Sequence, residues 1–151
     1  MTRTTSELRL PADPAYIIVA KRAASAFAAV AGFDVESMHD LTIAVAQACE
    51  NALACTARVV GAAGEGQIRL TFSLEDARLE VQVQTSCSRQ LVQAAMAAQQ
   101  ARQKAELEAR EVAEATDLAL RLMGLFVDDH SWRVDERTGG MRVRLTKYRA
   151  S

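Results

Sequence analysis

Residues 40–53 read Asp-Leu-Thr-Ile-Ala-Val-Ala-Gln-Ala-Cys-Glu-Asn-Ala-Leu, a run without glycine or proline. Apolar residues recur in and around this run at every third or fourth position, so they fall on one face of a helix. They are Met38, Leu41, Val45, Ala48, Ala52 and Cys55. Asp34 is a suitable N-cap, and a glycine-containing loop follows Val60. We therefore predict a long amphipathic helix from about Asp34 to Val60.

Segments with alternating polar and apolar residues lie on both sides of this helix and indicate strands. They cover residues 6–10, 67–73, 78–84, 131–135 and 141–147, and short connections join the last four into two hairpins. Helical spacing returns at residues 14–31 and 116–127. This order predicts an α+β fold, with a single, mostly antiparallel sheet covered on one face by helices. No linker or repeat interrupts it, so we expect one domain over residues 1–151.

The two flanking helices carry their own boundary signals. The helix over 14–31 is expected to end at Gly32, in the usual C′ position of a glycine. One face of it is expected to be buried, formed by Ile17, Ala20 or Lys21, Ala24, Phe27 and Val30. The helix over 116–127 is expected to stop at Asp128-Asp129-His130.

Residues 90–115 differ from the rest, because alanine, glutamine and glutamate dominate and glycine and proline are absent. Oppositely charged residues four apart, such as Arg102 and Glu106, support a helix here. Its apolar stripe is thin, which is typical of a solvated helix with one alanine-lined contact face. A partner-binding or lid element is the functional alternative.

Composition excludes several classes of function. The formal net charge is −1, from 18 basic and 19 acidic residues, so the basic footprint of a nucleic-acid-binding protein is missing. No apolar run is long enough to span a membrane, and the N-terminus lacks the apolar core of a secretory signal. Three cysteines, Cys49, Cys55 and Cys87, match no metal-ligand spacing. We expect a cytoplasmic protein with reduced thiols.

The chain resembles the GHKL (Bergerat-fold) ATPase family, and within it the anti-sigma factor serine kinases of bacterial partner-switching systems. The resemblance runs along nearly the whole chain. It is carried by residues 8–13, 40–53, 79–83, 118–123 and 138–147, of which 40–53 is the most specific because it matches the N-box helix of the family. The resemblance implies the Bergerat fold, ATP and Mg²⁺ as ligands, and phosphorylation of a STAS-domain protein as the activity.

Two N-box positions carry the chemistry in these kinases, a Glu that acts as base and, four residues later, an Asn that holds Mg²⁺ against the phosphates. Here Gln47 stands at the first position and Asn51 at the second. The spacing of four keeps both on one side of the helix. A carboxylate can take a proton and an amide cannot, so Gln47 could only orient a group by hydrogen bonding. Asn51 is either an Mg²⁺ ligand or a residue that bonds a neighbouring loop.

The other nucleotide-binding boxes of the family are substituted. The adenine box, Asp-x-Gly-x-Gly in the family, reads here with Thr85 for the Asp, Cys87 for the first Gly and Arg89 for the second. The phosphate-wrapping Gly-x-Gly-Leu box aligns with residues 117–120, so that Asp117 and Ala119 replace the glycines, and an aspartate repels phosphate. The last box, Gly-Thr, keeps Gly140 but continues with Met141.

A recognisable scaffold with a substituted pocket predicts a binding module. The chain would be an anti-sigma regulator that binds a sigma factor of RNA polymerase or a STAS-domain antagonist, as a homodimer, without productive ATP use and without binding nucleic acid or a membrane. Segment 90–115 would stand in the place of the ATP lid. The alternative is a divergent kinase that uses ATP and Mg²⁺ on a STAS-domain partner. A third interpretation is a homodimeric regulator that takes another small ligand in the altered pocket, where hydroxyl, thiol and guanidinium groups come from Thr85, Ser86, Cys87, Ser88 and Arg89.

Cys55 and Cys87 raise one further alternative. Cys55 follows Asn51 by one helical turn, and Cys87 lies in the substituted adenine box, so the two thiols could meet in the pocket. Two inert buried thiols are the simpler interpretation, and a redox switch is the functional one.

Overall fold

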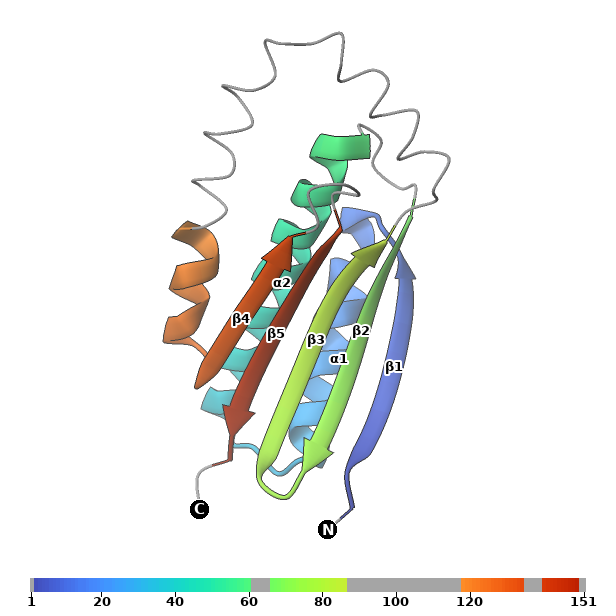
Figure 1. Ribbon diagram of the computed structural model, residues 1–151. Coiled ribbons are helices and arrows are strands. Elements are labelled where there is room, and N and C mark those ends of the chain that lie inside the picture. The colour runs from blue at the N-terminus through green and yellow to red at the C-terminus, as the bar shows by residue number, and fades with distance from the viewer. Residues whose placement is uncertain (1, 61–65, 87–117, 135–139, 150–151) are drawn as a thin grey trace, which may run out of the picture.

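The computed structural model describes residues 2–60, 66–86, 118–134 and 140–149. Its core is one antiparallel sheet of five strands, in the order β1-β2-β3-β5-β4 (Figure 1). The strands are β1 (Thr4–Pro11), β2 (Gln67–Glu75), β3 (Arg78–Ser86), β4 (Asp129–Val134) and β5 (Met141–Tyr148). Every neighbouring pair is antiparallel. The predicted strands are therefore all present, each within a few residues of its expected bounds.

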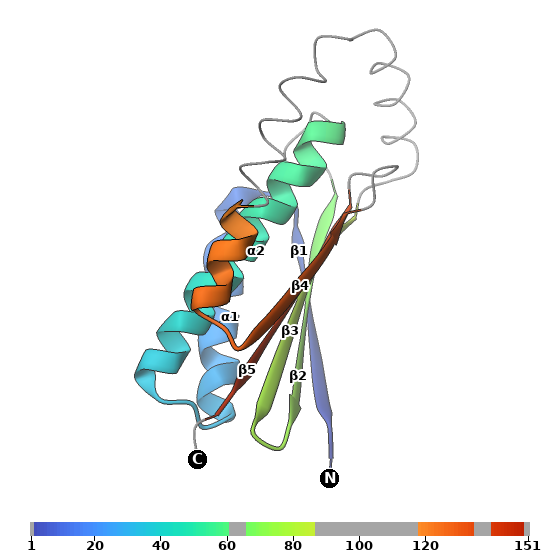
Figure 2. The same ribbon diagram turned by 60° about the vertical axis from the view of Figure 1, so that its left-hand side comes forward.

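Two long helices, α1 (Ile17–Val30) and α2 (Val35–Val60), pack side by side on one face of this sheet (Figure 2). The single-turn 3-10 helix η1 (Pro14–Tyr16) leads into α1, and residues 118–122 are helical and continue into η2 (Met123–Leu125). This arrangement confirms the α+β prediction of a sheet covered on one face. Within the described ranges, no helix is both long and apolar enough to cross a membrane.

Two boundaries differ from the prediction. The hairpin of β2 and β3 runs up to Glu75 and Arg78, so its turn is two residues long, and Asp76 adopts φ 51° to close it. An aspartate tolerates this left-handed conformation better than most residues with a side chain. Asp129 and His130 do not merely interrupt a helix, as predicted, because both already belong to β4. The ladder with β5 supplies the hydrogen bonds that extend the strand.

The core fills the space between the helices and the sheet. On the sheet side it consists of large aliphatic and aromatic residues, and on the helix side largely of alanines. Fully or almost fully buried alanines on α1 are Ala20, Ala24 and Ala28. Their spacing of four residues makes a narrow stripe, which lets α1 approach its neighbours closely. Val30 lies off this stripe and is 77% exposed, so the prediction that it is buried was wrong.

The connection between α1 and α2 is fixed by local polar contacts. Gly32 adopts φ +80°, which confirms the expected helix-ending glycine. Arg149, beyond the end of β5, donates a hydrogen bond from Nη1 to the carbonyl of Ala31 at 3.1 Å. Oδ1 of Asp34 accepts a bond from the backbone N–H of Ser37 at 2.7 Å, which confirms Asp34 as the N-cap of α2. This backbone hydrogen bond is the main reason that the pKa of Asp34 lies below its usual value.

A buried lysine of β5 contacts both α2 and the residue that follows η2. Lys147 is only 9% exposed, and its Nζ donates to the carbonyl of Phe126 at 2.9 Å. The same Nζ lies 3.8 Å from Oδ2 of Asp40, in the first half of α2. A buried ammonium is costly unless it is paired and hydrogen-bonded, so both contacts are needed to hold it there.

We expect Ala24→Leu to destabilise the protein by about 1–3 kcal/mol, because the added methylenes have no room between α1 and the sheet. Ala29→Leu, on the exposed side of the same helix, is the matched control and should change the free energy of unfolding by about 0.5 kcal/mol or less. Urea denaturation followed by circular dichroism measures both. Equal effects of the two substitutions would contradict the narrow-stripe packing.

We expect Asp34→Ala to lower the melting temperature at pH 6 but to have little effect at pH 2. The folded-state pKa of Asp34 lies below the usual value of 3.8 for an aspartate, so its contribution to stability is present above that value. The contribution is lost as the pH falls through the lower, folded-state pKa. Thermal melts of both proteins across this range test the sign, and a difference that persists unchanged at the lowest pH would refute the charged cap.

Candidate functional site

Helix α2 carries the two amides that the sequence singles out. The inner face of α2 packs on β3 and β5 through side chains of zero exposure, which include Ala48 and Ala52. Gln47 and Asn51 precede these two alanines by one residue each, so they lie one step around the helix from the buried face. Gln47 is half-buried, and Asn51 is 7% exposed. Packing of α2 therefore draws a polar side chain into the interior at Asn51.

Asn51 is the one polar side chain in the described part of the chain with a buried, unpartnered atom, its Nδ2. A buried donor without an acceptor costs about 1–3 kcal/mol, and native proteins contain few of them. Such a group is expected where a water, an ion or a ligand completes the hydrogen bonding. The observation therefore favours the interpretation of Asn51 as a pocket residue over a bond to a neighbouring loop.

Thr85 and Gly140 are brought together at the end of the β3–β5 ladder. The backbone N–H of Met141, the residue after Gly140, donates to Oγ1 of Thr85 at 3.1 Å. Thr85 is 3% exposed, and alternation along β3 places it on the helix-covered face with Val81 and Val83. The side chain at the adenine-recognising position thus holds two strands together, and it is a neutral hydroxyl that already accepts a hydrogen bond.

The glycine-box positions are only partly described. Ala119 lies in the helical stretch 118–122, half-buried, next to the buried Leu120. In the described part, residues 118–122 form a helix, whereas the sequence prediction aligns the glycine-rich phosphate loop of the family with 117–120. Asp117, Cys87 and Arg89 lie outside the described residues, as do the expected helix over 90–115 and residues 135–139 between β4 and β5.

The donor set fits a magnesium nucleotide only in part. The amide oxygen of Asn51 is a hard ligand that could supply one of the contacts of Mg²⁺. Within residues 2–60, 66–86, 118–134 and 140–149, no group of three His, Cys, Asp or Glu side chains is placed to hold a metal. Gln47 cannot take a proton, and Thr85 has no charge with which to attract the adenine amino group. Among the described residues, the arrangement can contact a ligand at Asn51, and the position of the family base carries the amide of Gln47.

The described thiol is unreactive. Cys49 is a free cysteine on the sheet-facing side of α2, with zero exposure, and burial raises its pKa to about 12. Because the thiolate is the reactive form, this cysteine is inert at neutral pH. Cys55 belongs to α2, but its side chain and the whole of Cys87 lie outside the described part, so their proximity stays a prediction.

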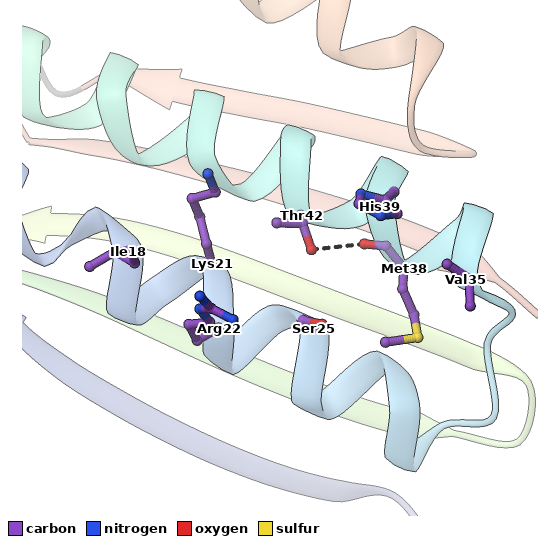
Figure 3. Close-up of a pocket in the computed structure, with 8 residues that line it drawn as sticks. All are labelled: Ile18, Lys21, Arg22, Ser25, Val35, Met38, His39 and Thr42. Carbon is purple, nitrogen blue, oxygen red and sulfur yellow. Dashed lines mark hydrogen bonds between the residues drawn. The ribbon is translucent and has the colours of Figure 1, made fainter.

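A second candidate site, which sequence reasoning missed, is a groove between the outer sides of α1 and α2 (Figure 3). It is lined by Ile18, Lys21, Arg22, Ser25, Val35, Met38, His39 and Thr42. Ile18 and Val35 are 56% and 70% exposed, so the groove presents apolar surface to the solvent. Lys21 extends from α1 towards α2. The signal that could have revealed it is the charge of α1, which carries Lys21 and Arg22 and no acidic residue.

The chain is similar to known proteins over nearly its full length. A family profile described as "Histidine kinase-like ATPase domain" matches residues 10–147. A protein named serine-protein kinase RsbW from Listeria monocytogenes serotype 4a (strain HCC23) is 29% identical over 147 residues, which covers 93% of this chain and 85% of the relative. The protein of the same name from Bacillus pumilus (strain SAFR-032) is 35% identical over 76 residues, 50% of this chain and 46% of the relative. These matches confirm the resemblance to the kinase branch of the GHKL family.

We expect Asn51→Ala to leave the free energy of unfolding of the ligand-free protein unchanged or to raise it by up to about 1 kcal/mol. The substitution removes an unpaired buried donor and introduces a better helix former. Leu41→Ala, at a fully buried position of the same helix, is the control and should cost about 2–5 kcal/mol. Urea denaturation compares them. A loss of similar size at Asn51 would mean that its amide is already satisfied in the folded protein.

Proposed function

The chain belongs to the histidine kinase-like ATPase family, whose profile matches residues 10–147, and on this premise we propose that it is an anti-sigma regulator of a bacterial partner-switching system. In this role it binds a sigma factor of RNA polymerase, a STAS-domain antagonist, or each in turn. Binding does not depend on productive use of ATP. The full-length similarity to proteins named serine-protein kinase RsbW supports the choice of this branch.

The observation that carries the proposal is the contrast between the scaffold and the chemistry at its N-box. The sheet, α1 and α2 are complete, and their core is closely packed. The position of the family base is occupied by Gln47, and the hydroxyl of Thr85 is engaged with the backbone of Met141. Phosphoryl transfer depends on positioning and electrostatic stabilisation, and an amide and a neutral hydroxyl supply little of either.

The alternative function is a divergent kinase that phosphorylates a STAS-domain protein. Asn51 favours it, because its buried amide is without a partner and an asparagine at this position is the Mg²⁺ ligand that the family resemblance implies. Transfer of labelled phosphate from ATP to a purified STAS-domain protein would establish it, provided that Asn51→Ala abolishes the transfer. Absence of transfer, together with partner binding, is the outcome that our proposal expects.

Several finer points belong to the same proposal. Residues 1–151 act as one domain in the cytoplasm, as a homodimer, with segment 90–115 in the place of the ATP lid. The third reading, another small ligand in the altered pocket, is supported only by the buried amide of Asn51. Calorimetric titration with ATP and with ADP, each with Mg²⁺, separates these ideas. Micromolar binding of a nucleotide would mean that the pocket still binds ATP as in the family. If no nucleotide binds, protein partners remain as the ligands.

We place the partner on the groove between α1 and α2. A surface with exposed Ile18 and Val35 beside two cationic side chains suits a segment that presents apolar and acidic residues together. In the described part of α1 the charge is entirely basic, so an acidic segment meets no opposing carboxylate on this helix. The occupant is therefore a helix or loop of the sigma factor or STAS-domain protein, with carboxylates next to its apolar side chains.

We expect the double substitution Lys21→Glu, Arg22→Glu to weaken partner binding about tenfold or more, because it reverses the charge that faces the acidic segment. Arg3→Glu with Arg78→Glu makes the same change in net charge at two exposed positions away from the groove, and should retain binding. Surface plasmon resonance with purified sigma factors and STAS-domain proteins of the encoding organism measures both. If the wild type binds none of these proteins, the proposed function is wrong.

A further inference from the structure

The face of the sheet opposite the helices carries an arginine array. In Figure 2 no described helix or strand lies over this face. The register of the strands defines one continuous row of outward-facing residues across all five of them. In spatial order the row reads Arg9, Arg69, Gln84, Arg142 and Arg133. The next row adds Arg144, beside Gln82 and Ser131. We call the four arginines of the continuous row, together with Arg144, the arginine face.

This arrangement works against stability. Arg9 stands directly opposite Arg69, and Arg142 directly opposite Arg133. Like charges at directly opposed positions of an antiparallel pair are destabilising. The rest of the chain does not share the excess of positive charge, because the net charge is −1. Mixed charges would keep a sheet surface solvated equally well. The far end of the same face has such a pair, with Nη2 of Arg78 3.1 Å from Oε2 of Glu80.

The guanidinium groups of the array are largely available. Arg9 is paired with Glu7 at 2.6 Å, and Arg69 donates to the side-chain oxygen of Gln84 at 2.8 Å. Within the described ranges, Arg133, Arg142 and Arg144 have neither an ion pair nor a side-chain hydrogen bond, and all three are exposed.

Among the described residues of these two rows, Glu7 is the one acid, and it shows what the array does to a carboxylate. The hydrogen bond from Arg9, with the charges of Arg9 and Arg69, holds the pKa of Glu7 below its usual value. A carboxylate from another molecule would meet a similar field beside Arg133, Arg142 and Arg144, which have no ion pair among the described residues. The outward-facing acids nearest to Arg144, Glu80 and Asp129, belong to the following row, and Glu80 is paired with Arg78.

We propose that the arginine face binds an acidic helix of a protein partner, laid across the strands. Adjacent strands are about 4.8 Å apart, so the five-strand row spans about 19 Å. An α-helix advances 5.4 Å per turn, and about 13 residues cover that length. A helix with a carboxylate on the same side at each turn therefore offers about one acid to each arginine. Arginine pairs bidentately with carboxylates, which favours this partner chemistry.

Two other occupants fit less well. A second copy of the chain, docked face to face, would bring two arginine arrays together, and the repulsion would oppose it. A single-stranded nucleic acid would be expected to stack its bases on aromatic side chains. On the described outward-facing positions of the sheet the aromatic residue is Tyr148, which pairs with Arg78 at the opposite end of the face. The inference is independent of the groove between α1 and α2, which lies on the other side of the molecule.

The test uses a fluorescein-labelled helical peptide of about 15 residues, with glutamate at each turn on one side and alanine and glutamine elsewhere. A peptide with glutamine in place of each glutamate, and an oligothymidylate of equal length, serve as comparison ligands. Fluorescence anisotropy measures their binding to the full chain. The variant Arg133→Gln, Arg142→Gln is compared with Arg3→Gln, Arg78→Gln, which has the same net charge but leaves the array intact.

We expect the acidic peptide to bind the wild type and the control variant, and to bind the Arg133→Gln, Arg142→Gln variant about tenfold more weakly or worse. Equal weakening in both variants would reduce the effect to overall charge and overturn the proposal. Tighter binding of the oligothymidylate with the same dependence on Arg133 and Arg142 would assign the face to nucleic acid instead. No binding of the acidic peptide to the wild type would refute the proposal outright.

A single substitution separates function from folding. Arg142→Glu converts the opposed pair with Arg133 into an attractive one, so the melting temperature should rise. The same variant should lose the acidic peptide. A fall in melting temperature, or peptide binding that survives the substitution, would contradict the view that the array is maintained for a partner at the expense of stability.

Discussion

The close packing of α2 against β3 and β5 is the contact on which the rest of the structure depends. The inner side of this helix is built of Ala44, Ala48 and Ala52 with Leu41, Val45 and Cys49, all of zero exposure. Small side chains bring the helix backbone near the sheet, so the position of every residue on α2 is set by the sheet beneath it. Asn51 is buried because its neighbours are, and not because any bond to its amide nitrogen draws it in. Lys147 extends the same constraint to the segment before β4.

This constraint separates the scaffold from the chemistry. The packing of α2 does not require a carboxylate at position 47, which is occupied by Gln47. At position 85, the hydroxyl of Thr85 accepts a hydrogen bond from the backbone of Met141 and so links β3 to β5. Substitutions at the N-box and the adenine box can therefore accumulate without loss of the fold. The surfaces that remain for recognition are the outer side of the helices and the open side of the sheet, and both are cationic. This separation supports our proposal that the chain binds acidic partners with its scaffold and does not depend on transferring phosphate.

Much of the architecture could be predicted from the sequence. Period-two alternation located all five strands, and helical spacing with Asp34 and Gly32 located both long helices, because these signals are local. The buried stripe of α1 was predicted less well, since alanine gives little contrast between faces and Val30 suggested a wider one. The turn at Asp76 was missed because an aspartate in a left-handed conformation is one of several local options.

The candidate site could be predicted from the sequence only in part, because several of its features depend on residues that are distant in the chain. Gln47 and Asn51 could be placed on one helix from their spacing, but the unpartnered state of the Asn51 amide depends on side chains from elsewhere in the fold. The bond between Thr85 and Met141 joins residues 56 apart in the chain. The arginine array is similar, since its members come from four strands and only the register aligns them. Three properties arise only when the sheet and helices are assembled: the burial of a side chain, the pairing of its hydrogen-bonding groups, and the alignment of charges from different strands. Residue spacing alone does not predict them.

The position of the two cationic surfaces on opposite sides of one sheet has a consequence for the stoichiometry of any complex. Partners on the groove and on the arginine face would approach from opposite sides of the sheet, so our two proposals together allow a ternary complex. One partner could then displace the other only through a coupling free energy transmitted across the sheet and α2, and this coupling would have to be reciprocal. A stiffly packed layer of alanines offers few alternative arrangements to carry such a coupling. On our two proposals, the groove and the arginine face would be occupied independently, whereas partners that share the groove still exclude each other.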